Sequence, residues 1–341
     1  MWARAATLLG ISMALAIQSG PGSADASAAP SKTILERVIA QGFVRCGIDM
    51  TPGFSGISES GAVTGFDVDF CRAVAAAALG DPDAIRTSRV STRHKFDAVR
   101  TGDLDVAFGM TTWTFTRDTE LGVAFPAVTF YDGQGFMTWA DAGIATPADI
   151  QGPVCVQKGT TSESTLADLL AGRAGVTMMP ATSSEDKFNA FAERRCAVVT
   201  GDRSELAAQR SRRTADPDAW VLLPGTISRE PLGPVVVAGD AQWFAIVRWA
   251  MLVPMIAEAR GLTSGSVATV PAKDGEMRRL LGDEPDFGAA LGLKPTWARR
   301  IVESVGSYEE IFTRNLGQLG LDRGENALWR DGGLIYAPPL R

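Results

Sequence analysis

A short unit that occurs twice along the chain constrains the fold more than any other feature of the sequence. Residues 96–110 read FDAVRTGDLDVAFGM and residues 188–202 read FNAFAERRCAVVTGD. Aligned from Phe96 and Phe188, the copies share a phenylalanine, an alanine, a valine and a glycine. Each copy is typical of the end of an amphipathic helix, a tight polar turn and a short apolar strand. We therefore expect two halves with the same local architecture.

The segments upstream of each copy extend the pattern. Apolar runs at residues 42–48 and 153–157 predict a first strand in each half. A polar loop and a helix follow each run, at residues 67–79 and 162–170, and Ser162 is a candidate N-cap. The order strand, helix, strand, helix, strand predicts two small α/β lobes with parallel strands. Sites at the carboxyl ends of these strands should then face each other across a cleft.

Composition excludes several classes of protein. A length of 341 residues suggests about two domains. The formal charge of −6 argues against nucleic acid as a partner, because nucleic-acid binding needs a basic surface. His94 is the only histidine, which excludes histidine-rich metal sites. We expect no metal and no cofactor.

The amino terminus is typical of a secretory signal peptide, which we assign to residues 1–26. Arg4 supplies a positive charge, residues 5–17 are uncharged and mostly apolar, and Ala24-Asp25-Ala26 fits the small-x-small cleavage rule. The apolar run is shorter than the about 20 residues that cross a bilayer, although an uncleaved anchor is the alternative. The most apolar later segment, residues 245–257, is interrupted by an arginine and a proline. We expect the mature protein to be periplasmic.

Export changes how the cysteines are interpreted. In an oxidising compartment four cysteines are candidates for two disulfides, with three pairings open. Pairing the first with the second and the third with the fourth keeps each bridge inside one lobe, whereas crossing pairs would lock the lobes together. Four buried free thiols are the alternative. The cysteines are Cys46, Cys71, Cys155 and Cys196.

Several longer segments resemble a known family. GFVRCGIDMTPGFS, GAVTGFDVDFCRAVAAAALGD, TTWTFTRDTELGVAFPAVTFYDGQGFM and VCVQKGTTSES are similar to the type 3 extracellular solute-binding proteins. TTWTFTRDT, YDGQGFM and the GGLIYAPP tail narrow the resemblance to the periplasmic general L-amino-acid-binding proteins of ABC transporters. The resemblance covers almost all of the mature chain.

The resemblance implies a two-lobe α/β fold of the type II periplasmic-binding-protein class, in which two crossing strands join the lobes. The crossings are expected near residues 136–140 and 234–238. Lobe 1 is then residues 27–138 plus 237–341, and lobe 2 is residues 139–236. The C-terminal helices, expected at residues 241–260 and 297–315, would pack on lobe 1.

A free amino acid presents a carboxylate and an ammonium on one carbon, so its binding site needs a fixed donor group and a fixed anion. Arg117 is the first choice for the carboxylate, because its planar fork can donate two parallel hydrogen bonds. Thr111, Thr112 and Thr114 precede it and could complete the cradle. The family places its carboxylate-binding arginine and Ser/Thr donors in this segment. An exposed arginine on a solvated loop is the alternative.

The opposing lobe offers the remaining head-group contacts. Thr160 and Thr161 lie at a helix start, where free backbone N–H groups favour an anion, although ordinary capping explains them too. Asp202 ends the second repeat, where the family keeps an aspartate, and is the candidate for the ammonium. Asp49 follows the first strand and is a weaker candidate. Each aspartate could instead serve only a turn.

The pocket for the ligand side chain is harder to predict. Phe54, Trp113 and Tyr131 lie near the matched motifs, and an aromatic wall would contact apolar and basic side chains. Each of these residues could equally belong to the core.

These residues together predict binding without catalysis. We expect a monomer that closes around a free L-amino acid by a Venus-flytrap motion and delivers it to the membrane permease of an ABC transporter. A periplasmic dehydratase-like enzyme on the same fold is one alternative, and it would need an acid or base in the cleft. A sensory binding protein without transport is the other.

Overall fold

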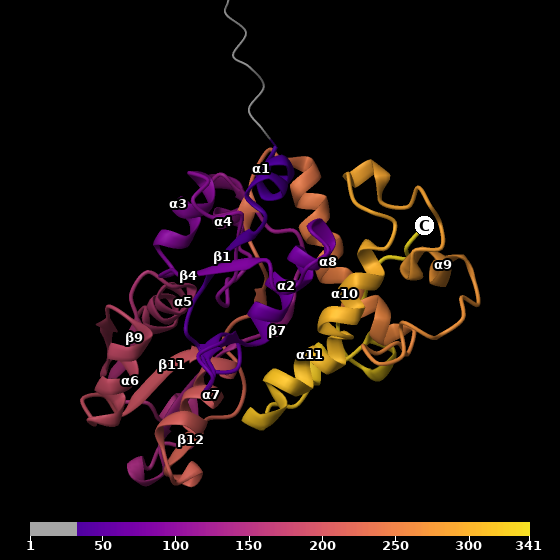
Figure 1. Cartoon of the computed structure of the whole chain (residues 1–341). Helices are drawn as coiled ribbons and strands as arrows, with labels where there is room; N and C mark the ends of the chain where they lie inside the picture. The colour runs from indigo at the N-terminus through magenta and orange to yellow at the C-terminus, as the bar shows by residue number, and fades with distance from the viewer. Residues whose placement is uncertain (1–32) are drawn as a thin grey trace, which may run out of the picture. The chain divides into compact units, whose positions relative to one another are not determined.

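The computed structural model describes residues 33–341 (Figure 1). The predicted signal peptide, residues 1–26, lies outside the described residues. Helices and strands alternate along the described chain, and its two larger sheets each carry helices. The predicted two-lobe α/β fold is therefore confirmed.

The first lobe is built on a parallel sheet in the order β4-β1-β5. Its central strand is buried, and Ile48 at the end of β1 pairs with Arg89 at the end of β4. Parallel strands bring their carboxyl ends to one edge, which is where ligands bind in such sheets. The elements of this part are α1 (Ile34–Gln41), β1 (Val44–Ile48), β2 (Gly56–Ile57), β3 (Val63–Thr64), α2 (Phe66–Ala78), β4 (Ile85–Arg89), α3 (His94–Arg100), β5 (Val106–Ala107), α4 (Phe115–Glu120) and β6 (Val123–Ala124).

The second lobe is built on a sheet in the order β10-β9-β11-β8-β12. Strands β10, β9 and β11 are parallel and repeat the order of β4, β1 and β5, which confirms the repeated unit. The elements are β8 (Gln134–Trp139), β9 (Gly152–Gln157), α5 (Thr161–Leu170), β10 (Val176–Ala181), α6 (Ser184–Ala192), β11 (Val198–Asp202), α7 (Arg203–Arg213) and β12 (Trp220–Leu222), with 3₁₀ turns at Ala140–Ala142, Pro147–Asp149 and Pro217–Ala219.

Two short antiparallel strands run between these sheets. In the pair of β7 (Phe130–Asp132) and β13 (Glu230–Leu232), Glu230 lies directly opposite Asp132. The segment expected as the first crossing falls largely in β8, which pairs with β11 and β12, so the chain joins the second sheet earlier than expected. Strand β14 (Val236–Val237) pairs with β6 after the chain has returned.

Four helices of 7 to 19 residues complete the first lobe after β14 within the described residues. In Figure 1, α8 and α10 lie beside α2, and α10 packs against both of them. The helix expected at residues 297–315 is interrupted, because Gly306 has a φ of +85° and Ser307 starts a new helix with a capping box. The elements are α8 (Ala241–Ala259), α9 (Gly275–Leu281), α10 (Trp297–Val305) and α11 (Tyr308–Asn315), with 3₁₀ turns at Ala289–Leu291, Gly317–Leu319, Gly324–Asn326 and Trp329–Asp331.

Buried polar side chains attach this C-terminal segment to β7. The Tyr308 hydroxyl donates to the Thr129 carbonyl at 2.8 Å. The Asn326 amide accepts from the backbone N–H of Tyr131 at 2.7 Å and donates to the Tyr131 carbonyl at 2.9 Å. Asn326 thus acts as a strand partner for β7, and it satisfies both backbone groups of the half-buried Tyr131.

The cysteines form the two disulfides that stay within one lobe each. Cys46 of β1 is bonded to Cys71 of α2, and Cys155 of β9 is bonded to Cys196, which precedes β11. Each bridge joins a central strand to a neighbouring element, with Cα separations of 6.4 and 5.8 Å. Within residues 33–341, no helix has the length and apolar character to cross a membrane.

Candidate functional site

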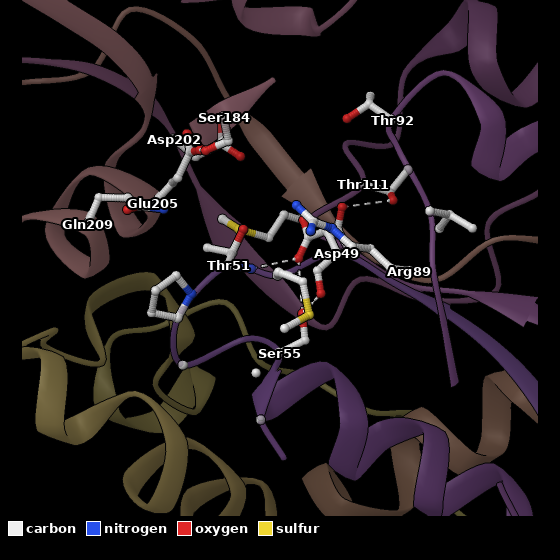
Figure 2. A pocket seen from close by; sticks show the side chains of 18 of the residues that line it. Asp49, Thr51, Ser55, Arg89, Thr92, Thr111, Ser184, Asp202, Glu205 and Gln209 are labelled. Carbon is white, nitrogen blue, oxygen red and sulfur yellow. Dashed lines mark hydrogen bonds between the residues drawn. The ribbon is translucent and has the colours of Figure 1, made fainter. Parts of the chain in front are cut away.

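A cavity of about 940 Å³ lies where the carboxyl ends of the two parallel sheets face each other (Figure 2). Asp49 follows β1 and Thr111 follows β5, while Asp202 ends β11 and Ser184 follows β10. Figure 2 shows Asp202 and Ser184 on one side, and Asp49 and Arg89 on the other. The repeat predicts this arrangement, because it places equivalent strand ends in both lobes.

The loop after β5 has an unusual backbone conformation, which hydrogen bonds from buried side chains stabilise. Gly109 and Met110 have φ values of +95° and +46°, and the second is unusual for a residue with a side chain. The Asp67 carboxylate accepts from the backbone N–H groups of Gly109 at 2.9 Å and Met110 at 3.4 Å. Lys95 donates to the Gly109 carbonyl at 2.5 Å and to Thr111 Oγ1 at 2.8 Å. The loop is therefore held in position before any ligand arrives.

Burial perturbs both of these supporting groups. It raises the pKa of Asp67 to about 7, and nearby Asp49 adds to the increase. It lowers the pKa of Lys95 to about 8, although the negative charge of Asp49 acts in the opposite direction. Neither residue was among the predicted site residues, because a buried lysine is rare and nothing in the local pattern distinguishes Lys95 from a surface lysine.

Arg117 lies on α4, close to the start of the helix. Its Nη1 donates to the Thr112 carbonyl at 2.8 Å, and its guanidinium lies 5.4 Å from the centre of the Phe96 ring. Burial lowers the pKa of Arg117, while the carboxylates of Glu230 and Asp202 oppose that change. The guanidinium remains a cation within the field of Asp202, as a site for a zwitterion requires.

Asp202 ends β11 on the opposite side of the cavity. Burial raises the pKa of Asp202 well above its usual range, and the nearby carboxylates of Asp132 and Glu230 add to the increase. Burial also raises the pKa of Asp132 to about 6. An ammonium group placed beside Asp202 would reverse this effect, because a positive charge favours the ionised carboxylate.

The start of α5 forms another part of the cavity wall, beside the residues predicted to bind the carboxylate and ammonium of the ligand. Thr160 is the N-cap, with its hydroxyl accepting from the backbone N–H of Glu163 at 3.2 Å, so the expected cap at Ser162 is wrong. Thr161 Oγ1 lies 3.3 Å from Thr112 Oγ1 across the cavity and 3.3 Å from the Glu230 carboxylate. The two lobes therefore touch at Thr112 and Thr161.

Four of the predicted site residues, Tyr131 among them, do not line this cavity. Phe54 is 1% exposed and packs edge-on against Phe66 and Phe130 in the core. Trp113 is 39% exposed and stacks on Phe125, with ring centres 5.8 Å apart. Thr114 accepts from the backbone N–H of Arg117 at 3.3 Å, so it caps the helix that carries the arginine.

The other predicted residues are brought together. The cavity wall includes Asp49, Thr111, Thr112, Arg117, Thr160, Thr161 and Asp202. Tyr131 lines a separate, smaller cavity of about 280 Å³. Within the described residues, no group of three His, Cys, Asp or Glu side chains is placed to hold a metal ion.

Two α/β lobes with a polar cleft at their facing strand ends define a solute-binding protein of the type II periplasmic class. The sequence pattern of the bacterial extracellular solute-binding proteins, family 3, matches residues 44–282. The chain belongs to this family.

Related proteins match nearly the whole chain. The general L-amino acid-binding periplasmic protein AapJ of Rhizobium johnstonii is 41% identical over 324 residues, which is 92% of this chain and 95% of AapJ. The glutamate/glutamine/aspartate/asparagine-binding protein BztA of Rhodobacter capsulatus shows the same identity and the same coverage of each chain.

Solved structures agree with the fold. A periplasmic binding protein of an ABC transporter from Brucella ovis, solved with glutathione bound, matches with a TM-score of 0.87 and 39% identity over 91% of this chain and 100% of that one. The holo arginine-binding protein of T. maritima matches with a TM-score of 0.55 over 63% of this chain and 92% of its own. At 23% identity, the second comparison shows the fold alone.

Proposed function

We propose that this protein captures free L-amino acids in the periplasm and delivers them to the membrane permease of an ABC transporter. It acts as a monomer and performs no chemistry on the ligand. The first lobe is residues 33–133 plus 237–341 and the second lobe is residues 134–236, because β8 belongs to the second sheet. The hinge motion is centred on β7 and β13.

The observation that carries the proposal is that Arg117 and Asp202 line the same cavity from opposite lobes. Arg117 binds the ligand carboxylate with the help of Thr111, Thr112 and the start of α5. Asp202 accepts hydrogen bonds from the ligand ammonium. A single amino-acid head satisfies both groups.

Closure follows from this division of contacts. A ligand shifts the equilibrium between open and closed forms only if it binds one form better. Because its head contacts both lobes only when they are together, the closed form is favoured, in a hinge motion about a few residues. The names of AapJ and BztA, which specify amino-acid binding, support this choice of ligand.

An enzymatic function on the same fold has less support. His94 is exposed, does not line the cavity, and its Nδ1 lies 3.0 Å from Ser91 Oγ. Asp67 has a raised pKa but does not line the cavity, and it accepts hydrogen bonds from backbone N–H groups. Asp202 lines the cavity and acts electrostatically on Arg117, which suits a zwitterion site. A sensory protein would bind its ligand in the same way, so an assay of amino-acid transport is needed to distinguish a sensory role from transport.

Calorimetry tests the proposal directly. Ligand-stripped protein is titrated with the common L-amino acids and with their deaminated and decarboxylated analogues. We expect binding of intact amino acids and loss of binding when either head group is missing. Arg117→Lys and Asp202→Asn should each weaken every ligand by about 2 kcal/mol, the scale of a charged hydrogen bond.

Matched controls are available in the first lobe, away from the cavity. Arg299→Lys, at a half-buried position, and Asp322→Asn, at an exposed one, make the same chemical changes outside the cavity. A folded protein that binds no amino acid, or an Asp202→Asn variant that weakens only one side-chain class, would refute the proposed head-group roles.

A further inference from the structure

The cavity extends well beyond the residues that would hold an amino-acid head. Pockets for drug-sized ligands span about 300–1,000 Å³, and this cavity has about 940 Å³. The lobes already touch beside the head-group residues, at Thr112 and Thr161. A free amino acid in this cavity would therefore leave most of it to water.

The C-terminal segment forms part of the cavity wall. Arg314 and Asn315 of α11, and Gln318 of the following 3₁₀ turn, line the cavity although they lie outside the part matched by the family pattern, residues 44–282. That turn also contacts α7 of the second lobe. Figure 2 shows the C-terminal helices, in yellow-olive, on the same side as Gln209.

A continuous wall connects the head-group end to this segment. The loop that follows Asp49 passes through Thr51 to Gly53, which lies so close to α11 that an added Cβ would be 3.0 Å from the Asn315 carbonyl. A ligand held at Arg117 and Asp202 can therefore extend along this loop towards α11.

The side chains at the C-terminal end favour an anion. Arg72 and Arg314 share the carboxylate of Asp69, at 3.4 and 2.7 Å. Within residues 33–341 the Nε of Arg72 is buried without a hydrogen-bond partner, and the exposed carboxylate of Asp83 lies 3.6 Å from it. Two guanidinium groups on one buried carboxylate leave hydrogen-bond donors unsatisfied.

The facing wall from α7 adds another cation. Arg212 lines the cavity and forms no ion pair within the described part of the chain. The acids nearby already have partners, because Glu205 pairs with Lys187 at 2.7 Å and Glu185 pairs with Arg213 at 2.7 Å. This end of the cavity therefore carries an excess of positive charge.

We propose that the site takes short peptide-like solutes that carry a free amino-acid head at one end and a second carboxylate at the other, as γ-glutamyl peptides do. The head binds Arg117 and Asp202, and the second carboxylate binds Arg314 and Arg212. This inference rests on the proposed function and specifies its ligand class. Glutathione, bound in the related protein from Brucella ovis, has both features.

Calorimetry with three ligands tests the inference. S-methylglutathione carries both features and has no thiol to react with the disulfides, its glycine ethyl ester lacks the second carboxylate, and the tightest free amino acid serves as reference. In Arg314→Gln and in Arg212→Gln, the affinity for S-methylglutathione should fall about tenfold or more while the reference stays unchanged. The ethyl ester should bind the unaltered protein about as weakly as S-methylglutathione binds the two variants. The control variant Arg299→Gln should leave the affinity for S-methylglutathione unchanged.

The outcomes separate this inference from the proposed function. If amino acids bind but S-methylglutathione does not, or if the ester binds as tightly as the acid, the inference is wrong and amino-acid capture stands. If no ligand binds to the folded protein, both are wrong. Should Arg314→Gln fail to fold because Asp69 loses one of its partners, Arg212→Gln and the ester still decide.

Discussion

Lys95 and Lys187 occupy equivalent positions in the two lobes. Each is buried on the helix before the third strand of its parallel sheet, one residue before the aligned phenylalanines. Lys95 donates to the Gly109 carbonyl at 2.5 Å, and Lys187 donates to the Thr200 carbonyl at 3.3 Å and to the Glu205 carboxylate at 2.7 Å. Both lysines thus stabilise the backbone from which the site is built.

Removing Lys187 should be costly. In Lys187→Met the Glu205 carboxylate loses its buried partner, so we expect the free energy of unfolding to fall by about 3 kcal/mol. Urea denaturation followed by circular dichroism measures this change. Lys294→Met, at an exposed position, provides the matched control. A loss no larger than that of the control would mean that Lys187 does not support the second lobe.

Removing Lys95 should affect binding more specifically. In Lys95→Met the Gly109 carbonyl and the Thr111 hydroxyl lose a charged donor, so the loop that positions the ligand carboxylate becomes less ordered. We expect a loss of affinity of about 2 kcal/mol for every ligand with an amino-acid head. Calorimetry on the folded variant measures it, and an unchanged affinity would contradict the supporting role.

Ligand-free stability should fall as the pH rises from about 4 to about 7. Burial raises the pKa of Asp132 to about 6 and of Asp67 to about 7, from an ordinary value of 3.8. A carboxyl with a raised pKa in the folded state holds its proton more tightly there, so the stability it contributes is present at low pH and is lost as pH rises through the folded pKa. Thermal unfolding of stripped protein across this range checks the direction.

Ligand affinity should change with pH in the opposite direction. The pKa of Asp202 is raised in the free protein, and an ammonium favours its ionised form, so binding should release a proton and strengthen with pH. Titrations in two buffers of different ionisation enthalpy measure the proton count. Asp202→Asn should abolish that part of the release, and an equal release in the variant would assign it to another group.

Each disulfide should contribute to stability independently. The bridges close loops with sequence separations of 25 and 41 residues, for which loop-closure entropy gives about 3.5 and about 4 kcal/mol. Replacing both cysteines of one bridge by alanine should lower the denaturation midpoint, and the two losses should add because the bridges lie in different lobes. Strong non-additivity would indicate that they constrain a common element.

Asn326 should be more important than its place near the C-terminus suggests. In Asn326→Ala the backbone N–H and carbonyl of the half-buried Tyr131 lose their partners, which costs about 2 kcal/mol. Asn326→Asp keeps the acceptor and removes the donor, so an intermediate loss is expected. If the two variants lose the same free energy of unfolding, only the hydrogen bond that Asn326 donates to the Tyr131 carbonyl stabilises β7.

The sequence predicted the architecture well because the fold repeats itself. The repeated unit, the apolar first strands and the cysteine positions are local patterns that can be recognised in the sequence. The parallel strand orders β4-β1-β5 and β10-β9-β11 agree with the fold that these patterns predict. The break at Gly306 also has a local signal, a glycine followed by Ser307 and by Glu310 as in a capping box. Residues at or just after the strand ends, such as Asp49 and Asp202, line one cavity.

The remaining errors involve long-range packing. Phe54 lies near a matched motif, but whether a phenylalanine faces the cleft or the core depends on Phe66 and Phe130, which come from other parts of the chain. The membership of β8 in the second sheet depends on pairing with β11 and β12. The roles of Asp67 and Lys95 depend on a loop whose positive φ values only the folded backbone reveals.

The C-terminal segment is attached to β7 through Asn326 and forms part of the cavity wall through Arg314. Changes in the length or composition of this tail would therefore alter the ease of lobe movement and the size of cargo together. Ligand preferences should therefore not be transferred between family members that have this C-terminal segment and members that lack it.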